Sequence, residues 1–196
     1  FLTAVKLAME RRDRINDGPG DTPAAPESSE IEAWRKRLAD GAPFDENEGL
    51  DLLDAFGFST PARRIAIDRD AVRQAATDIG YPVVLKTAEP GILHKSDVGG
   101  VALNLHDEAA LLAAYDVMAS RLGPRVLVAA MASKGVELAA GIVIDAQFGP
   151  LVMVAAGGVL IEIMKDRRFL MPPAGRVSAR RAIDSLACRP LLDGVR

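Results

Sequence analysis

The stretch that decides the fold is Gly80–Val101, with the sequence GYPVVLKTAEPGILHKSDVGGV. Gly80, Tyr81 and Pro82 predict a turn, and the apolar run Val83–Lys86 that follows is typical of a buried strand. Pro, Gly and polar residues then continue to Gly100, which indicates a loop, and the next apolar run predicts a second strand at 101–105. The stretch therefore predicts two strands joined by a long glycine-containing loop.

This loop has the composition of an anion-binding site. Gly99 and Gly100 let backbone N–H groups approach an anion closely, and Lys86 and Lys95 supply positive charge to a polyphosphate. A flexible hairpin loop with solvated lysines has the same spacing, so both interpretations stay open on the residues alone. Neither the G-x-G-x-x-G fingerprint after a strand nor a Walker-type phosphate loop is present in the sequence.

His94 is the residue in this loop with the most specific chemistry. A neutral imidazole beside Lys95 and a glycine-rich anion site can accept a phosphoryl group on a ring nitrogen, with the lysine offsetting the developing charge. A histidine in a loop is also commonly an ordinary polar surface group. The residues alone leave both roles open.

Helices and strands alternate around this stretch. Asp45 and Glu48 have the spacing of a capping box at the start of a helix that Gly57 ends, and Asp68 or Asp70 caps a helix that continues to residue 79. Further helices are predicted at 30–39, after a cap at Asp107, and at 178–187. Further strands are predicted at 64–67, 125–129, 136–144 and 151–156, and the last two are expected to form an antiparallel hairpin. This order predicts an α/β or α+β fold with two subdomains and a ligand cleft between them.

Composition excludes several classes of protein. The 196 residues carry 24 basic and 27 acidic side chains, a net charge of −3, and only 5% aromatic residues, which argues against nucleic acid as a partner. The apolar stretch 141–164 is interrupted by polar residues, Pro and Gly, so no membrane span is expected. Cys188 is the single cysteine, which excludes an internal disulfide and indicates a plain structural or surface thiol in a cytoplasmic protein. The arginine pairs at 11–12, 63–64, 167–168 and 180–181 predict mostly solvated faces.

Three strings carry a resemblance to a known family: GYPVVLK…ILHKSDVGGV, KGVELAAGIVIDAQFGPLVMVAAGGVLIEIMKD and PLLDG. From about Phe44 to Arg196 the chain resembles the ATP-grasp domain of the ADP-forming (NDP-forming) acyl-CoA synthetases, which include acetate–CoA ligase. The resemblance implies the ATP-grasp fold, two subdomains with a nucleotide cleft between them. It also implies the reaction of an acid, CoA and ATP to acyl-CoA, ADP and phosphate through an acyl phosphate and a phosphohistidine.

The resemblance also implies a role for individual residues. His94 matches a phosphohistidine that receives its group from a first histidine in an upstream domain. Lys86 matches a strand-end lysine on the nucleotide phosphates, and Glu137 matches a glutamate near the nucleotide cleft. The phosphate-covering loop would comprise Lys95, Ser96, Gly99 and Gly100.

Two departures from the family pattern bear on nucleotide binding. Ala129 and Ala130 stand where relatives usually have Gln-Glu, so a polar contact to the nucleoside is lost, although backbone groups of that strand end can still hold adenine. The segment that usually supplies Mg²⁺ ligands is expected beyond Arg196. The fragment is therefore expected to bind Mg·ATP weakly or not at all and to be inactive alone.

The expected organisation is a closing helix of an upstream domain at 1–15, a linker with a short helix at 16–43, a first ATP-grasp subdomain at 44–130 and a C-terminally incomplete second subdomain at 131–196. CoA would be bound by upstream CoA-binding and ligase domains in the same or a partner chain, and an oligomer is expected. Two alternatives stay open. One is a regulatory or vestigial ATP-grasp module of a protein acetyltransferase, and the other is a β chain of the succinyl-CoA synthetase type.

Overall fold

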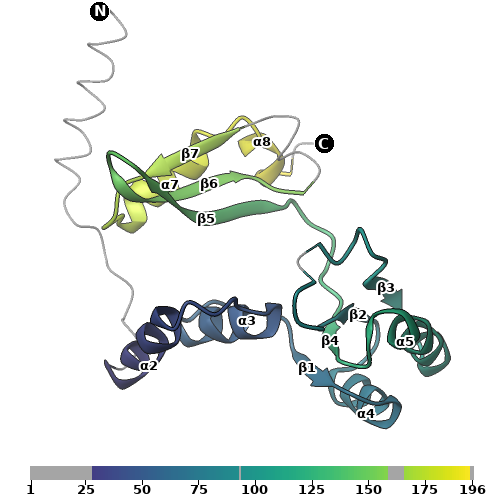
Figure 1. Cartoon of the computed structure of the whole chain (residues 1–196). Helices are drawn as coiled ribbons and strands as arrows, with labels where there is room; N and C mark the ends of the chain where they lie inside the picture. The colour runs from purple at the N-terminus through teal and green to yellow at the C-terminus, as the bar shows by residue number, and fades with distance from the viewer. Residues whose placement is uncertain (1–27, 93, 159–165, 195–196) are drawn as a thin grey trace, which may run out of the picture. The chain divides into compact units, whose positions relative to one another are not determined.

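The computed structural model describes residues 28–92, 94–158 and 166–194, and these form two compact units whose boundary in the sequence lies after residue 133 (Figure 1). The first unit spans Ala25–Ser133 and the second includes Lys134–Arg196. Each unit has its own antiparallel sheet.

The sheet of the first unit has four strands in the order β1-β4-β2-β3, with every neighbouring pair antiparallel. Its strands are β1 (Arg63–Ala66), β2 (Val83–Thr87), β3 (Val101–Leu105) and β4 (Val126–Ala130). Helix α4 (Arg69–Ile79) packs on β1 and β4, helix α5 (Glu108–Leu122) packs on β2 and β3, and the two helices touch each other. Both helices therefore cover the same face of the sheet.

The main hydrophobic core lies between these helices and the sheet. Its fully buried side chains include Val72 on α4, Leu111 on α5, Val83 and Leu85 on β2, and Val126 on β4. Because β2 lies between two neighbouring strands and under α5, its residues are almost all buried, as the apolar run predicted.

Side-chain caps begin the helices where the sequence predicted them. Asp45 accepts the backbone N–H of Glu48, and the Glu48 side chain returns to the N–H of Asp45, which completes the capping box of α3 (Glu46–Ala55). Asp68 caps α4 and Asp107 caps α5 in the same way, through the N–H group three residues on. A further helix, α2 (Ser28–Ala39), precedes α3.

The second unit is a three-stranded sheet in the order β5-β6-β7. The predicted antiparallel hairpin is confirmed as β5 (Leu138–Asp145) and β6 (Gly149–Ala156), with β7 (Arg167–Leu170) on the other side of β6. Helix α7 (Arg176–Asp184) packs on β7 and β6, and α8 (Arg189–Leu192) follows it. A small core contains Ala156, Leu186 and Cys188, so the single thiol is buried.

The structure corrects several predictions. Strand β7 was not expected, because its Arg167-Arg168 pair indicated a solvated face. The helix predicted at 178–187 begins earlier and ends at Asp184, since Ser185 starts a turn toward α8. The Arg63 side chain is only 7% exposed, so the prediction of a solvated face is wrong there.

The helix expected at 1–15 and residues 16–27 of the expected linker fall outside the part of the chain that the structure describes. Among the helices that it does describe, none is long and apolar enough to cross a membrane.

Candidate functional site

Lys86 and Lys95 converge on one carboxylate. Lys86 lies near the end of β2, and Lys95 lies in the loop between β2 and β3. The Nζ atom of Lys86 is 2.5 Å from Oε1 of Glu46, and the Nζ atom of Lys95 is 2.5 Å from Oε2 of the same residue. The two ammonium groups are thus held on either side of a single anion, and the interpretation of Lys86 and Lys95 as freely solvated lysines is wrong.

Glu46 is the first residue of α3, where the positive end of the helix dipole favours an anion. Burial raises the pKa of its carboxyl, but hydrogen bonds from Lys86 and Lys95 outweigh burial, so the pKa lies below its ordinary value. Glu46 therefore stays ionised at neutral pH, and the three side chains form a charged cluster with one excess positive charge.

A second acid–base pair lies directly beside this cluster. The Arg125 guanidinium donates to Oδ2 of Asp45 at 2.8 Å and also to the carbonyl oxygen of Ala88. The backbone N–H of Arg125 donates to Oε1 of Glu89 at 2.8 Å. These contacts join the start of α3, the end of β2 and the start of β4. They therefore fix the positions of the elements that carry Glu46 and Lys86.

The loop after β2 rejoins the sheet at Gly100, where its backbone lies close to Thr87 on β2. Its N–H donates to the carbonyl of Lys95 at 2.7 Å, and its carbonyl accepts the N–H of Thr87 at 2.8 Å. A Cβ atom at Gly100 would lie 2.5 Å from Cγ2 of the fully buried Thr87, so only glycine fits without movement. Gly99 has a φ of +69°, which also favours glycine. Both glycines are therefore required by the path of the loop.

His94 and Ser96 flank Lys95 and are both exposed. The carbonyl of His94 accepts the N–H of Asp97 at 3.2 Å, and the carbonyl of Ser96 accepts the N–H of Gly99 at 3.2 Å. These bonds give the loop a turn conformation that leaves the His94 side chain accessible to solvent. Five of the predicted residues thus lie with His94 in one region of the first unit: Lys86, Lys95, Ser96, Gly99 and Gly100.

Glu137 belongs to the second unit, where it lies just before β5. Its backbone carbonyl accepts the N–H of Gly157 at 2.8 Å, and a Cβ atom on Gly158 would lie 2.6 Å from its carboxylate oxygen Oε2. The glycine pair 157–158 therefore leaves room for Glu137, whose side chain is exposed.

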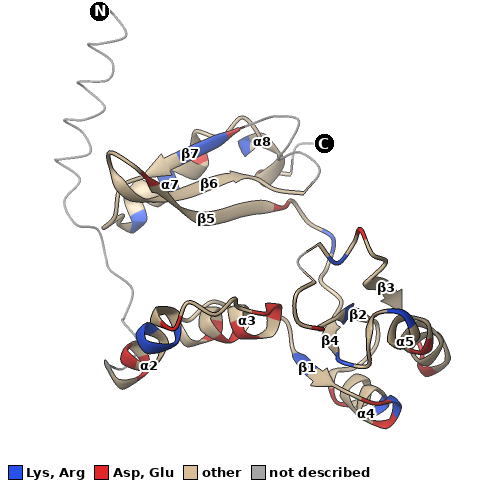
Figure 2. Cartoon of the chain, in the orientation of Figure 1, with Lys and Arg blue, Asp and Glu red and all other residues tan. Residues whose placement is uncertain are grey.

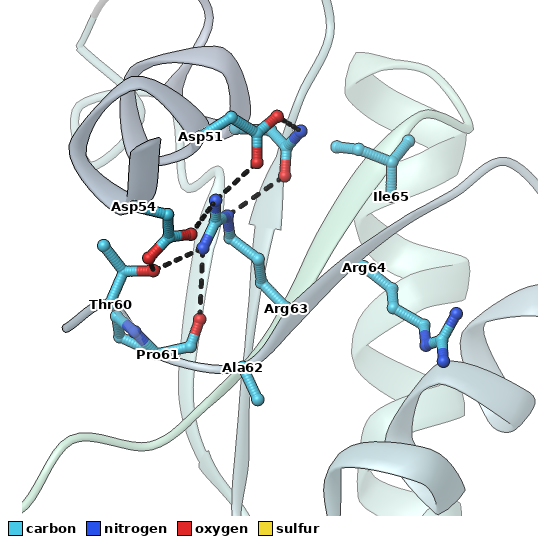
Figure 3. Close-up of a pocket in the computed structure, with 9 residues that line it drawn as sticks. Asp51, Asp54, Thr60, Pro61, Ala62, Arg63, Arg64 and Ile65 are labelled. Carbon is cyan, nitrogen blue, oxygen red and sulfur yellow. Dashed lines mark hydrogen bonds and ion pairs between the residues drawn. The ribbon is translucent and has the colours of Figure 1, made fainter. Parts of the chain in front are cut away.

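An open polar pocket elsewhere in the first unit surrounds Arg63 (Figure 3). The Arg63 guanidinium donates to Asp51 at 2.5 Å, to Asp54 at 2.9 Å and to the hydroxyl of Thr60 at 2.6 Å. It also donates to the side chain of Asn47. Because its donors are already used within the chain, Arg63 fixes α3 to β1 and is not a free cation for a ligand.

The donor chemistry of the lysine cluster suits a phosphate group. An ammonium group has three N–H donors, and the bond to Glu46 uses one donor on Lys86 and one on Lys95. Phosphate oxygens can accept the others. A metal ion instead requires several ligating side chains around one point. Residues 28–92, 94–158 and 166–194 contain no group of three or more His, Cys, Asp or Glu side chains placed to hold one.

The strand end at Ala129–Met131 leaves few donors for a nucleobase. The N–H of Ala130 donates to the carbonyl of Ala62 at 2.8 Å, and the N–H of Met131 donates to the carbonyl of Pro82 at 3.1 Å. Since both N–H groups are engaged within the chain, a base held here by backbone groups would need carbonyl oxygens or other N–H groups.

Sequence reasoning missed Glu46 and the pair of Asp45 with Arg125. Asp45 was interpreted only as a helix cap, and Glu46 was given no role. Their partners lie between 40 and 80 positions further along the chain, so no local pattern reveals the contacts.

Comparison with known proteins shows the family to which the chain belongs. Residues 38–196 match the ATP-grasp domain family. The chain is also 34% identical over 173 residues to the β subunit of acetate–CoA ligase [ADP-forming] I from Pyrococcus furiosus, an alignment that covers 84% of this chain and 75% of that subunit. The chain therefore belongs to the ATP-grasp domain family and, within it, to the group found in ADP-forming acyl-CoA synthetases.

Two further relatives show how much of such an enzyme the chain represents. Acetate–CoA ligase [ADP-forming] I of Archaeoglobus fulgidus is 37% identical over 172 residues, which cover 84% of this chain but only 25% of that protein. A solved acetyl-coenzyme A synthetase 1 of Ca. Korarchaeum cryptofilum, in complex with coenzyme A and Ca-AMPCP, superposes with a TM-score of 0.76 at 32% identity, covering 84% of this chain and 76% of that one. The chain thus spans about a quarter of the length of the single-chain relative.

Proposed function

We propose that this chain is the nucleotide-binding, phosphoryl-transfer part of an ADP-forming acyl-CoA synthetase, which converts an acid, CoA and ATP to acyl-CoA, ADP and phosphate. The observation that carries the proposal is the convergence of the Lys86 and Lys95 ammonium groups beside the exposed His94. Two cations spaced by one carboxylate suit a phosphate group, and the neighbouring imidazole can accept a phosphoryl group.

In this proposal His94 is the phosphoryl carrier. A neutral ring nitrogen attacks phosphorus, a new N–P bond forms, and the bond from phosphorus to the donor breaks with its electron pair leaving on the donor. Lys86 and Lys95 offset negative charge on the phosphoryl oxygens as the group moves between His94 and the nucleotide. Ser96, Gly99 and Gly100 would cover the phosphates, and Glu137 would lie near the nucleotide.

Mg²⁺, CoA and further domains complete the proposal. Mg²⁺ bound to the nucleotide would offset phosphate charge, and its ligands are expected beyond Arg196. CoA and the first histidine would be supplied by CoA-binding and ligase domains in the same or a partner chain, within an oligomer located in the cytoplasm. The subdomains at 44–130 and 131–196, the linker at 16–43 and the helix at 1–15 are part of the same proposal.

The alternatives are weaker. The relatives reported above are ligases and a synthetase, which does not favour a regulatory or vestigial module of a protein acetyltransferase. A β chain of the succinyl-CoA synthetase type is not favoured either, because the names of these three relatives refer to acetate or acetyl-coenzyme A.

The proposal is tested by labelling the complete protein that carries this chain with γ-³²P-ATP and Mg²⁺. We expect an acid-labile, alkali-stable label that the His94→Asn variant loses. His106→Asn is the matched control, because His106 is exposed at the end of β3 and lies outside the proposed site. Label that survives in His94→Asn, with the upstream histidine also replaced, would overturn the role of His94. A wild-type protein that takes no label would favour the regulatory module.

A further inference from the structure

We propose that Glu46 is a positioning residue for the phosphate-binding loop: its carboxylate holds Lys95, and with it the segment that carries His94, beside the end of β2. The structural part of this inference depends only on the contacts of the loop. Its kinetic part rests on the proposed function.

The contacts of the described loop residues point to Lys95 as the anchor. His94, Ser96, Asp97 and Gly99 are exposed, whereas the side chain of Lys95 is only 17% exposed. The hydrogen bonds from Asp97 to His94 and from Gly99 to Ser96 lie within the loop itself, and the backbone link to β2 runs from the Lys95 carbonyl through Gly100 to Thr87. The side chain of Lys95 adds a restraint at the same residue.

Contacts from the loop tip to other elements differ greatly in length. Arg121 on α5 donates to the carbonyl of Val98 at 3.4 Å, a long bond at an exposed position. The bond between Lys95 and Glu46 is 2.5 Å long and partly buried. Short charge-assisted bonds are the stronger kind, so the Glu46 carboxylate is the main side-chain restraint on this part of the loop.

Charge explains why a carboxylate is needed at this position. Lys86 and Lys95 would repel each other if no anion separated them, and the repulsion is strong where the groups are partly shielded from water. Lys86 is fixed by its place on β2, so without Glu46 the mobile partner is Lys95. The loop would move with it, and His94 is its immediate neighbour.

Glu46 can act as an anchor because its own position is fixed. It begins α3 directly after Asp45, which caps the helix and is bound by Arg125 from the start of β4. Further along the helix, Asp51 and Asp54 are bound by Arg63 on β1. Figure 2 shows acidic residues along α3. The helix is thus held at both ends, and the loop is held by the helix.

A competing explanation makes the opposite prediction. If Glu46 only competes with a phosphate group for Lys86 and Lys95, its removal would take away a competing anion and tighten nucleotide binding. If Glu46 positions the loop, its removal leaves both lysine charges in place but allows His94 to leave its position. The rate of phosphoryl transfer would then fall, while nucleotide affinity would change little.

The structural test compares amide hydrogen exchange at Asp97 and Gly100 in the wild-type chain, Glu46→Gln and the matched control Glu48→Gln. Glu48 lies on the same helix but pairs with Arg37. We expect exchange to rise about tenfold in Glu46→Gln and to stay at the wild-type rate in Glu48→Gln. Wild-type rates in Glu46→Gln would overturn the proposal.

A charge-swapped variant separates loop anchoring from loss of the helix. In Glu46→Lys combined with Lys95→Glu, a carboxylate in the loop would meet a lysine on α3 and Lys86 on β2. We expect this double variant to recover slow exchange in the loop, whereas Glu46→Lys alone exchanges fast. Fast exchange in both would overturn the proposal.

The kinetic test measures labelling of His94 in a single turnover of the complete protein. We expect Glu46→Gln to slow labelling at least tenfold, while its nucleotide Kd stays within about threefold of wild type. Wild-type labelling rates, or clearly tighter nucleotide binding, would overturn the positioning role. If the wild-type protein itself takes no label, the proposed function fails, and the exchange experiments still decide the role of Glu46.

Discussion

Asp45 and Arg125, which lie 80 positions apart in the sequence, form an ion pair of 2.8 Å that joins the first turn of α3 to the start of β4. Helix α3 has no buried residue, so apolar packing contributes little to its position. Contacts of Asp45, Glu46, Asp51 and Asp54 with basic side chains of the sheet region hold it there instead. The placement of the candidate site therefore depends on ionic contacts.

Arg125→Ala is expected to lower the free energy of unfolding by about 2 kcal/mol, because it removes a charge-assisted bond and leaves the partly buried Asp45 without its partner. Urea denaturation at pH 7 measures this change. Arg69→Ala is the control, since Arg69 and Asp116 form a longer pair of 3.5 Å with both side chains more than half exposed. That change should cost less than about 0.5 kcal/mol.

The cost of Arg125→Ala should depend on pH. Burial raises the pKa of Asp45, but hydrogen bonds from the backbone of Glu48 and from Arg125 outweigh it, so the folded-state pKa lies below the ordinary 3.8. A depressed carboxyl pKa contributes stability above the unfolded-state pKa and loses it as pH falls through the folded-state pKa. The difference between wild type and variant should thus be full at pH 7 and shrink below pH 3.8. A difference that grows in acid would contradict this account.

Much of the first unit could be predicted because its signals are local. The caps at Asp45, Asp68 and Asp107 and the apolar run of β2 lie within a few residues of the elements they define. Strand β7 lacks such a signal. Its RRFL sequence forms a strand because β6 offers an edge and Arg168 reaches Asp166 and Ser185.

The candidate site was predicted in its residues but not in its electrostatics. Lys86, Lys95, Gly99 and Gly100 lie in one short stretch, so their proximity follows from the hairpin. Their counter-ion, Glu46, is 40 positions or more away. The burial of Arg63 could likewise not be predicted, since an arginine pair in a sequence does not show which of its members will bind acidic side chains of a distant helix.

Gly100→Ala should destabilise the chain by about 1–3 kcal/mol, because the new Cβ atom would meet the buried Thr87 at 2.5 Å and the carbonyl of Lys95 at 3.0 Å. Gly49→Ala is the matched control. Gly49 lies in α3, and a Cβ atom added there would have no other atom within 4 Å, so alanine should stabilise the helix by about 0.5–1 kcal/mol. Urea denaturation of both variants checks the contrast, and equal effects would refute it.

Mg²⁺ should have little effect on nucleotide binding by this chain alone. The described residues offer no cluster of three metal-binding side chains, whereas Lys86 and Lys95 offer charge to phosphates. Calorimetric titration with ADP should give a similar weak Kd with Mg²⁺ and with EDTA. The Lys86→Met variant should weaken that binding further, and Lys36→Met on α2 should leave it unchanged. A Kd that improves tenfold or more with Mg²⁺ would show that the chain itself supplies metal ligands.

Cys188 should react slowly with a thiol reagent in the native chain, because its side chain is only 2% exposed. Asp166 holds the turn that buries it: its Oδ2 atom accepts the N–H of Ala187 at 2.6 Å and the N–H of Cys188 at 3.2 Å, while Oδ1 accepts from Arg168. Asp166→Ala removes all of these acceptors and should raise the rate of thiol modification about tenfold through local opening. Asp145→Ala in the β5–β6 turn is the control and should leave the rate unchanged. Equal rates in all three proteins would mean that the apolar packing of Ala156 and Leu186 alone protects the thiol.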